Sequence, residues 1–461
     1  MLWSPTRETV HRYCAGSQLQ WISCNLLAAW VFVTPDVQAQ ICPETSRNAE
    51  DRAPACGVAL EREAVQPLQV LHWWKSVSER KAVDLLASRL ADENLAWRDS
   101  GTGGNAGVAA DVILKSRVLA GDAPDVAQIN GVTIMEWARL GLLLDIDDAA
   151  AAGKWEKRIL PEIFDLIQPH RSVVAAPLGI HRINILFYNR RLFAEHGIVP
   201  PRDWSEFEST ASTLQRKGVT PLAQSGEPWQ VATLFETLVL SEGGAEFYRD
   251  LFVQRKAYSY ADLRLTHALQ RLRGLKKWMP APVPEQPWFE TAKLFASGSA
   301  AMMVMGDWMK GELNAWGLIT DDAFGCSAVP GTAEHHLYDV DTLAMLVKHR
   351  ARRAAQLKFA RIVASSTVQA EYNRLKGSVT VLRNPDFSSM DGCARASWKL
   401  FTRGPAARVP SLVHRMAADQ VTKNGIIAEV HRFFIDDRVT VADVQHRLAV
   451  IAQQHRTKVE K

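Results

Sequence analysis

The sequence lacks several features that define common classes of enzyme and binding protein. The glycine-rich residues 100–105 are not followed by the Gly-Lys-Ser/Thr signature of a phosphate loop. There is no CxxC motif and no Cys/His spacing typical of zinc sites. There is also no long basic run, and 54 basic residues against 50 acidic ones leave a formal charge of only +4. These absences argue against a P-loop nucleotide site, a zinc site and general nucleic-acid binding.

An apolar run near the N-terminus is typical of an export signal. Arg7 and Arg12 precede it, residues 21–33 are mostly apolar with a polar break at Asn25, and Val-Gln-Ala at 37–39 offers a small-residue cleavage site. The run is shorter than a membrane-spanning helix requires. We therefore predict a signal peptide at residues 1–39, a polar extension at 40–66 and a periplasmic location. Because the basic region is long and weak, an uncleaved anchor is the alternative.

Cysteine is scarce, with six in the chain, and removal of the leader would leave four. Cys42, Cys56, Cys326 and Cys393 allow three pairings in an exported protein. The pairing of Cys42 with Cys56 is favoured, because it would close a short loop in a polar, proline-containing extension. Four free thiols are the alternative.

The length and the order of patterns predict a two-lobed α/β protein. A chain of 461 residues, 47% of them apolar, is too long for one compact core. Strand-like runs alternate with helical patterns from residue 68 onward, which is typical of mainly parallel sheets flanked by helices. The Pro-Leu-Gly at 177–179 is awkward in the centre of a sheet. It predicts a hinge near Pro177, where the chain leaves one lobe and enters the other.

Aromatic and polar side chains gather where the predicted strands end. Trp73 and Trp74 follow one strand, and Glu79 opens the helix after it. Asn130 follows a second strand and Trp308 a third, while later acidic residues alternate along another. Ligands of open α/β sheets bind beyond the carboxyl ends of strands. Indole faces beside polar groups are suited to a ligand with flat apolar faces and many hydroxyls, so we predict a sugar-binding cleft.

Several stretches, in this order, resemble a known family. They are residues 72–74, 124–131, 177–189, 226–230, 305–312, 338–345 and 376–378. Together they resemble extracellular solute-binding proteins (family 1) that serve ABC sugar importers, most closely the periplasmic glucose- and mannose-binding branch. The resemblance implies a two-lobed periplasmic-binding-protein fold with the ligand in the interlobe cleft. It places lobe 1 at 67–177 and 338–388 and lobe 2 at 178–337 and 389–461, with hinges near 177, 335 and 388.

The resemblance also implies the residues that contact the sugar. They are Trp73, Trp74, Glu79, Asn130, His181, Trp229, Trp308, Asp339, Asp341, Lys376 and His414, with Asp307 as a further candidate. Such a protein would act as a monomer, without metal or cofactor, and deliver its sugar to the permease subunits of an ABC transporter. No catalytic residue and no nucleic-acid partner is expected.

The sequence departs from that branch at positions that bear on the choice of sugar. Asn130 stands where a lysine is expected, and Asp339 where an asparagine is expected. Val77 and Ser78 replace a glycine pair, and Thr380 replaces a proline. Because donors and acceptors differ at these positions, the hydroxyl pattern that fits also differs.

Three other functions are compatible with the same residues. A glycosidase could use two carboxylates among Asp307, Glu312, Asp339 and Asp341, although no spacing defines an acid and a nucleophile. A metal site could use His335 and His336 with the two aspartates that follow. A sensor ectodomain would use the same sugar pocket but present the ligand to a membrane receptor.

Overall fold

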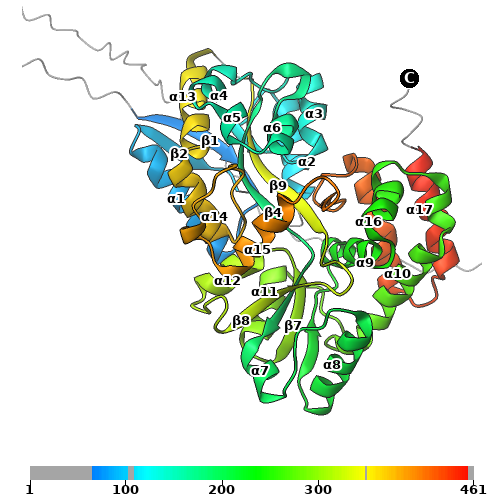
Figure 1. The fold of residues 1–461 in the computed structure, drawn as a ribbon. Coiled ribbons are helices and arrows are strands. Elements are labelled where there is room, and N and C mark those ends of the chain that lie inside the picture. Colours follow the sequence, from blue (N-terminus) through cyan, green and yellow to red (C-terminus); the bar gives the residue numbers. More distant parts are fainter. Residues whose placement is uncertain (1–64, 102–107, 348–349, 455–461) are drawn as a thin grey trace, which may run out of the picture. The chain divides into compact units, whose positions relative to one another are not determined.

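The computed structural model describes residues 65–101, 108–347 and 350–454 (Figure 1). The strands are β1 Gln66–Leu71, β2 Leu95–Asp99, β3 Val126–Gln128, β4 Ala175–Arg182, β5 Ile185–Asn189, β6 Thr220–Ala223, β7 Ala300–Met305, β8 Phe324–Ala328, β9 His336–Met345 and β10 Arg408–Pro410. The α-helices of the first half are α1 Val77–Ala91, α2 Val108–Leu119, α3 Val132–Arg139, α4 Asp147–Ala152, α5 Trp155–Arg158, α6 Pro161–Ile167, α7 Arg190–Glu195 and α8 Trp204–Arg216. Those of the second half are α9 Pro228–Tyr248, α10 Leu263–Gly274, α11 Trp288–Ala296, α12 Trp308–Ala315, α13 Arg350–Val363, α14 Ser366–Lys376, α15 Gly392–Phe401, α16 Gln420–Ile435 and α17 Val441–Gln454.

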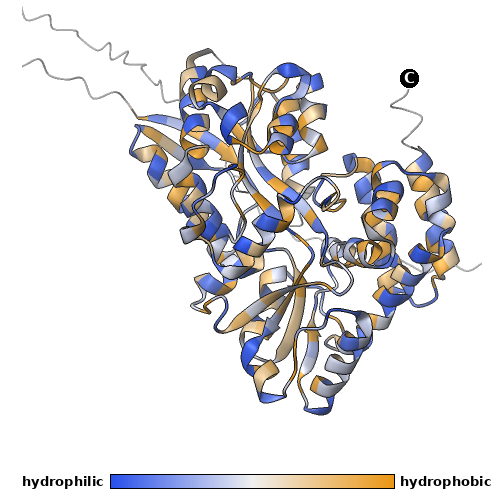
Figure 2. Cartoon of the chain, in the orientation of Figure 1, coloured by the Kyte–Doolittle hydropathy of each residue, from blue (hydrophilic) through white to orange (hydrophobic). Residues whose placement is uncertain are grey.

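The strands form two sheets, which confirms the predicted α/β class. The large sheet has the order β10-β9-β3-β1-β2, and β4 also pairs with β9. The small sheet has the order β6-β7-β5-β8. Helices surround both sheets, and hydrophobic segments lie towards the strands while hydrophilic ones lie outward on many of these helices (Figure 2). No helix in the described ranges is both long and apolar enough to cross a membrane.

The expectation of mainly parallel sheets is wrong for the small sheet. There β5 pairs antiparallel with β7 and with β8, and only β6 and β7 are parallel. The reason lies in how the chain enters the sheet. β5 begins beside Arg182 and Asn184, whereas β7 and β8 end there: the Asp307 N–H donates to the Arg182 carbonyl at 3.0 Å and the Val329 N–H to that of Asn184 at 3.2 Å. β5 therefore runs away from the point towards which its neighbours run.

Each sheet has its own hydrophobic core. The large-sheet core includes Leu68, Val126, Ile180 and Leu343 among its buried side chains. The small-sheet core starts at Ile183 and contains residues of β5 and β7 and the buried apolar side chains of α9. The chain therefore passes from one core to the other between residues 180 and 183, within a few residues of the predicted hinge. The lobe and hinge boundaries themselves stay a prediction.

The Pro-Leu-Gly stretch lies inside β4 rather than at its end. Pro177 pairs with Thr342 of β9, and the register then shifts before Gly179 pairs with Asp341. This irregularity accommodates a residue that cannot donate to the ladder. At Gly179 a Cβ would lie 2.2 Å from Asn373 Oδ1, so the strand needs glycine where it passes α14. Both effects fix the part of β4 that leads to His181.

One disulfide joins Cys326 of β8 to Cys393 of α15. The Cα atoms are 5.8 Å apart, a separation typical of a disulfide. The bond ties the small sheet to the segment that follows α14. The favoured pairing of Cys42 with Cys56 lies outside the described residues.

Candidate functional site

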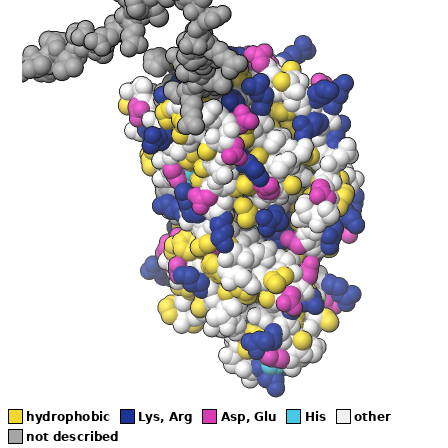
Figure 3. Space-filling view, turned by 90° about the vertical axis from the view of Figure 1, so that its left-hand side faces the viewer, with side chains coloured by type: hydrophobic (Ala, Val, Ile, Leu, Met, Phe, Trp, Pro, Cys, Tyr) yellow, Lys and Arg dark blue, Asp and Glu magenta, His cyan; other side chains and the backbone are white. Residues whose placement is uncertain are grey.

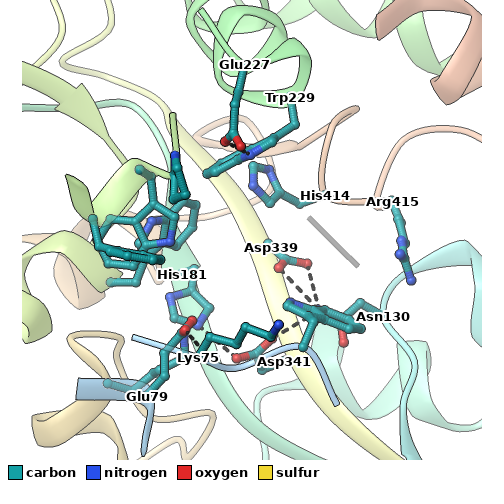
Figure 4. Close-up of a pocket in the computed structure, with 16 residues that line it drawn as sticks. Lys75, Glu79, Asn130, His181, Glu227, Trp229, Asp339, Asp341, His414 and Arg415 are labelled. Atoms are coloured by element: carbon teal, nitrogen blue, oxygen red, sulfur yellow. Dashed lines mark hydrogen bonds and ion pairs between the residues drawn. The ribbon is translucent and has the colours of Figure 1, made fainter. Parts of the chain in front are cut away.

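A cavity of about 320 Å³ lies between residues of the large-sheet and small-sheet cores (Figure 4). β9 runs through it, and the segments after β1, β3, β7 and β10 contribute to its wall. The first turns of α9 and α11 and the last residue of α14 complete it. The lining residues are Trp73, Lys75, Glu79, Asn130, His181, Glu227, Trp229, Pro287, Trp288, Phe289, Trp308, Asp339, Asp341, Lys376, His414 and Arg415.

The structure brings together most of the side chains that were expected to contact a ligand. Those that line the cavity are Trp73, Glu79, Asn130, His181, Trp229, Trp308, Asp339, Asp341, Lys376 and His414. Trp74 and Asp307 do not line it. Residues separated by more than 300 positions thus share one cavity.

Trp74 belongs to the large-sheet core instead of the cavity. Its indole is 1% exposed and stacks on His72 at a centroid distance of 5.1 Å. On another side it meets Tyr372. Trp73, the adjacent residue, is only partly buried and lines the cavity, with the Arg415 guanidinium 5.0 Å from its ring centroid. The two neighbouring indoles therefore have different positions: Trp74 packs in the core, and Trp73 forms part of the cavity wall.

Asp307 does not line the cavity but forms a hydrogen bond with His181, which does. Its carboxylate accepts hydrogen bonds from His181 Nδ1 and, at 2.9 Å, from the Arg182 N–H. His181 Nε2 donates to Asp341 Oδ2 at 3.1 Å. The imidazole therefore bridges a carboxylate that follows β7 and a carboxylate on β9. Burial lowers the pKa of His181, but the two carboxylates outweigh this effect and raise it to about 9.

The charge on His181 predicts a pH-dependent contribution to stability. The folded-state pKa of about 9 lies above the ordinary 6.5, so the contribution is fully present below about pH 6.5 and is lost as the pH rises through 9. A His181→Asn variant should be less stable than the unaltered protein by up to about 3 kcal/mol at pH 6, and the gap should shrink by pH 9.5. Urea unfolding of both proteins at several pH values measures the gap. A gap that does not change with pH would contradict the charged bridge.

Glu79 serves both the start of α1 and the cavity wall. Its Oε2 accepts the N–H groups of Lys75 and Ser76, at 2.8 and 3.0 Å, while Ser76 Oγ accepts the Glu79 N–H in a capping box. Its Oε1 accepts Lys376 Nζ at 3.0 Å. Burial by itself raises the pKa of Glu79, but Lys376 and the backbone donors hold it below its ordinary value. The Glu79 side chain therefore both caps the start of α1 and lines the cavity.

The two aspartates of β9 have different surroundings. Asp341 accepts from His181, from Gln128 Nε2 at 2.8 Å and from Asn130 Nδ2 at 3.1 Å, and its pKa lies far below the ordinary value: burial opposes that shift, and the His181 charge outweighs it. Asp339 faces the same side of the strand, where its side-chain donor is Asn130 at 3.3 and 3.5 Å and its backbone donor is the Val340 N–H. Burial raises the pKa of Asp339 to about 6.

Six lining residues were not predicted. Lys75, Glu227 and Arg415 are within two positions of predicted residues, so adjacency was a usable signal for them. Glu227 Oε2 accepts Trp229 Nε1 at 2.9 Å and Gln230 Nε2 at 2.7 Å at the start of α9. The other three are Pro287, Trp288 and Phe289, which lie at the start of α11 and follow no strand.

The residues suggested for a metal site do not come together. His336 is buried and its Nε2 contacts Ser397 Oγ at 2.9 Å, away from the cavity wall. Burial lowers the pKa of His336 well below its ordinary value. Across the described residues there is no group of three or more His, Cys, Asp or Glu side chains that could hold a metal ion.

A ligand-sized cavity between two α/β cores is suited to binding a small molecule. The chain belongs to the bacterial extracellular solute-binding protein family, whose profile matches residues 94–370. Members bind solutes rather than transform them, so a glycosidase activity is set aside.

Two curated relatives support this assignment, and one solved structure has a similar fold. A "Probable sugar-binding periplasmic protein" of Rhizobium meliloti (strain 1021) is 29% identical over 373 residues, covering 80% of this chain and 90% of the relative. A protein of the same description from Mesorhizobium japonicum is 31% identical over 331 residues, covering 72% and 79%. The bacterial solute receptor AcbH, described as having an exclusive substrate preference for β-D-galactopyranose, matches with a TM-score of 0.73 at 17% identity, covering 86% and 100%. At that identity the likeness to AcbH concerns the fold.

Proposed function

We propose that the protein binds a sugar in the periplasm, in particular a monosaccharide such as glucose or mannose, and delivers it to an ABC-type membrane permease. The observation that carries the proposal is the composition of the cavity wall. Trp73, Trp229 and Trp308 line the cavity together with the buried charged side chains of Glu79, Asp339, Asp341 and Lys376. The descriptions of the curated relatives as sugar-binding periplasmic proteins support the ligand class and the location.

The chemistry of the wall matches that of a sugar. A pyranose has apolar C–H faces that pack on indoles and a rim of hydroxyls that need hydrogen-bond partners. Trp229 and Trp308 lie near each other, with centroids 6.4 Å apart, and His414 contacts both rings. Charged acceptors and donors such as Asp339 and Lys376 make stronger hydrogen bonds to hydroxyls than neutral groups do.

The cavity volume favours a small ligand. Ligand pockets commonly measure about 300–1,000 Å³, and a cavity of about 320 Å³ lies at the lower end of that range. A monosaccharide is therefore preferred over a longer saccharide. Purified protein should show a raised unfolding temperature with one or a few sugars in a panel of hexoses, pentoses and disaccharides, because a ligand that binds only the folded state stabilises it. No shift with any sugar would contradict the proposal.

The proposed mechanism is closure of two lobes around the sugar, with hinges near 177, 335 and 388. The wall draws on both cores, so a bound sugar would favour the arrangement in which they approach. A contact outside the cavity joins the same two parts: Glu312 of α12 accepts the N–H groups of Val77 and Ser78 at the start of α1, at 3.1 and 2.8 Å. A carboxylate at a helix N-terminus is favourable. The closed form would then dock on the permease.

Trp308 gives a direct test of the stacking role. Trp308→Ala should lower the affinity for the sugar identified in the panel by about 10- to 100-fold, because an indole face in contact with the ligand is lost. Trp316→Ala is a matched control, since Trp316 ends the same helix but does not line the cavity. Titration calorimetry of the two variants measures the difference. Equal affinities would remove Trp308 from the site.

A further inference from the structure

Asp339 is the carboxylate of the cavity wall whose hydrogen-bonding capacity is least used. Glu79 accepts three donors within 3.0 Å. Asp341 and Glu227 each accept two or more donors at about the same range of distance. Asp339 is 5% exposed, its side-chain donor is Asn130 Nδ2 at 3.3 and 3.5 Å, and the backbone N–H of Val340 also donates to it. A buried carboxylate with long contacts has oxygens left to accept stronger donors.

Two side chains beside Asp339, Asn130 and His414, already have other hydrogen-bond partners. Asn130 Nδ2 is shared with Asp341, and Asn130 Oδ1 accepts the Thr342 N–H at 3.2 Å. His414 Nδ1 contacts Ser411 Oγ at 2.9 Å. Figure 4 shows Asp339 between His414 and Asn130, beside the open part of the cavity. A ligand in that space is therefore the group best placed to supply the missing donors.

We propose that Asp339 is the specificity-determining residue of the cavity: its two carboxylate oxygens accept two neighbouring hydroxyls of a neutral sugar. The inference rests on the proposed function and deepens it by naming the part of the sugar that is read. A charged ligand fits less well. An anionic group would meet both Asp339 and Asp341, and a cationic group would meet the Asn130 amide donor with Arg415 and Lys423 nearby.

The ionisation of Asp339 gives the proposal a second signature. The titratable groups that interact with it are Asp341 and Tyr338 on the same strand, His181 on β4, Tyr372 on α14, His414 after β10 and Lys423 on α16. Because burial raises the pKa of Asp339 to about 6, the carboxyl is partly protonated in mildly acidic solution. Hydroxyls that donate to it favour the ionised form, so binding releases a proton. Affinity should then fall by about tenfold for each pH unit below 6.

The test uses titration calorimetry with glucose, mannose, galactose and xylose as probes at pH 7.5. The sugar that binds most tightly is then replaced by its monodeoxy analogues, each lacking one hydroxyl. In the unaltered protein, removing the hydroxyl at either of two neighbouring positions should lower the affinity by about tenfold or more. Asp339→Asn should lower the affinity for the complete sugar by about 100-fold. Asp339→Asn should bind these two deoxy analogues almost as well as it binds the complete sugar. Its affinity should no longer depend on pH below 6.

Asp84→Asn is the matched control, because Asp84 is an exposed aspartate of α1 outside the cavity. If Asp339→Asn does not fold, the deoxy series and the pH profile of the unaltered protein test the proposal by themselves. Normal affinity in Asp339→Asn, or no pair of neighbouring hydroxyls that matters, would overturn the role of Asp339 while leaving sugar binding intact. Failure of every sugar to bind the unaltered protein would instead overturn the proposed function, and this inference with it.

Discussion

Replacing Lys376 with methionine is expected to lower the free energy of unfolding by about 3–5 kcal/mol, because it leaves a buried carboxylate without its cation. Lys376 Nζ lies 3.0 Å from Glu79 Oε1, and the two side chains are only 4% and 10% exposed. Methionine keeps the apolar stem of lysine, so the loss concerns the charge. Burial lowers the pKa of Lys376, but the charges of Glu79 and Asp341 outweigh that effect and raise it. Urea unfolding of the unliganded protein near pH 7 measures the change.

Two further proteins separate the ion pair from a general effect of losing a lysine. Lys157→Met removes an exposed lysine of α5 and should leave stability within about 0.5 kcal/mol of the unaltered protein. The double change Glu79→Gln with Lys376→Met should recover part of the loss, since no unpaired charge stays buried. A loss below about 1 kcal/mol in Lys376→Met would show that Glu79 is adequately stabilised by the backbone donors of α1.

The α/β class could be predicted from the sequence because its signals are local. The apolar residues 300–305 form strand β7, and residues 108–119 form helix α2. The direction of pairing is not local. β5 meets β7 and β8 from positions more than 100 residues away, and their directions follow from how each connects to residues 182–184. No pattern within one strand contains that information.

The cavity could be predicted in part because strand ends converge. Asp339 and Asp341 alternate on β9, so period-two geometry places both on one face. The sequence could not show which of Trp73 and Trp74 lines the cavity and which lies in the core. Both follow the end of β1 at Leu71, and the conformation of the turn decides their directions. Trp288 and Phe289 start α11 without a preceding strand, so the rule about strand ends does not apply to them.

Some residues that build the site do not touch the cavity, and sequence patterns give no sign of them. Glu236 is fully buried on α9. It accepts Ser411 Oγ, the Leu412 N–H and the Tyr248 hydroxyl, each at 2.7 Å. These bonds fix residues 411–415, which carry His414 and Arg415 to the cavity wall. From the sequence alone, a glutamate in an apolar helix is expected to be exposed. The hydrogen bonds of Glu236 to residues 411 and 412 explain why it is buried.

On the face shown in Figure 3, Lys and Arg side chains are interspersed with Asp and Glu, in keeping with the balanced composition. Other charged side chains are buried. Several are paired, as in Glu79 with Lys376 and Asp111 with Arg415 at 2.9 Å. Lys423 of α16 is an exception: its side chain is fully buried, and its Nζ has no hydrogen-bond partner among the described residues.

Replacing Lys423 with methionine is therefore expected to stabilise the protein, by about 4 kcal/mol at pH 6. Burial lowers the pKa of Lys423 to about 7, and the nearby Arg415 charge acts in the same direction. The unfolded chain has the ordinary pKa of 10.5, so below pH 7 folding buries the ammonium at full cost. As the pH rises from 7 to 10.5 the folded protein releases the proton first, and the cost falls to zero.

The advantage of Lys423→Met over the unaltered protein should follow the same course. It should be largest at pH 6, smaller at pH 9 and absent above about pH 10.5, which is the opposite of what a lost favourable ion pair would give. Urea unfolding at these pH values, with Lys157→Met as the exposed control, measures it. Destabilisation at pH 6 would show that the ammonium has an effective partner in solution. The contrast with Lys376→Met then rests on one physical difference: Glu79 compensates one buried lysine at hydrogen-bond distance, whereas Asp111 and Asp339 act on the other only from farther away.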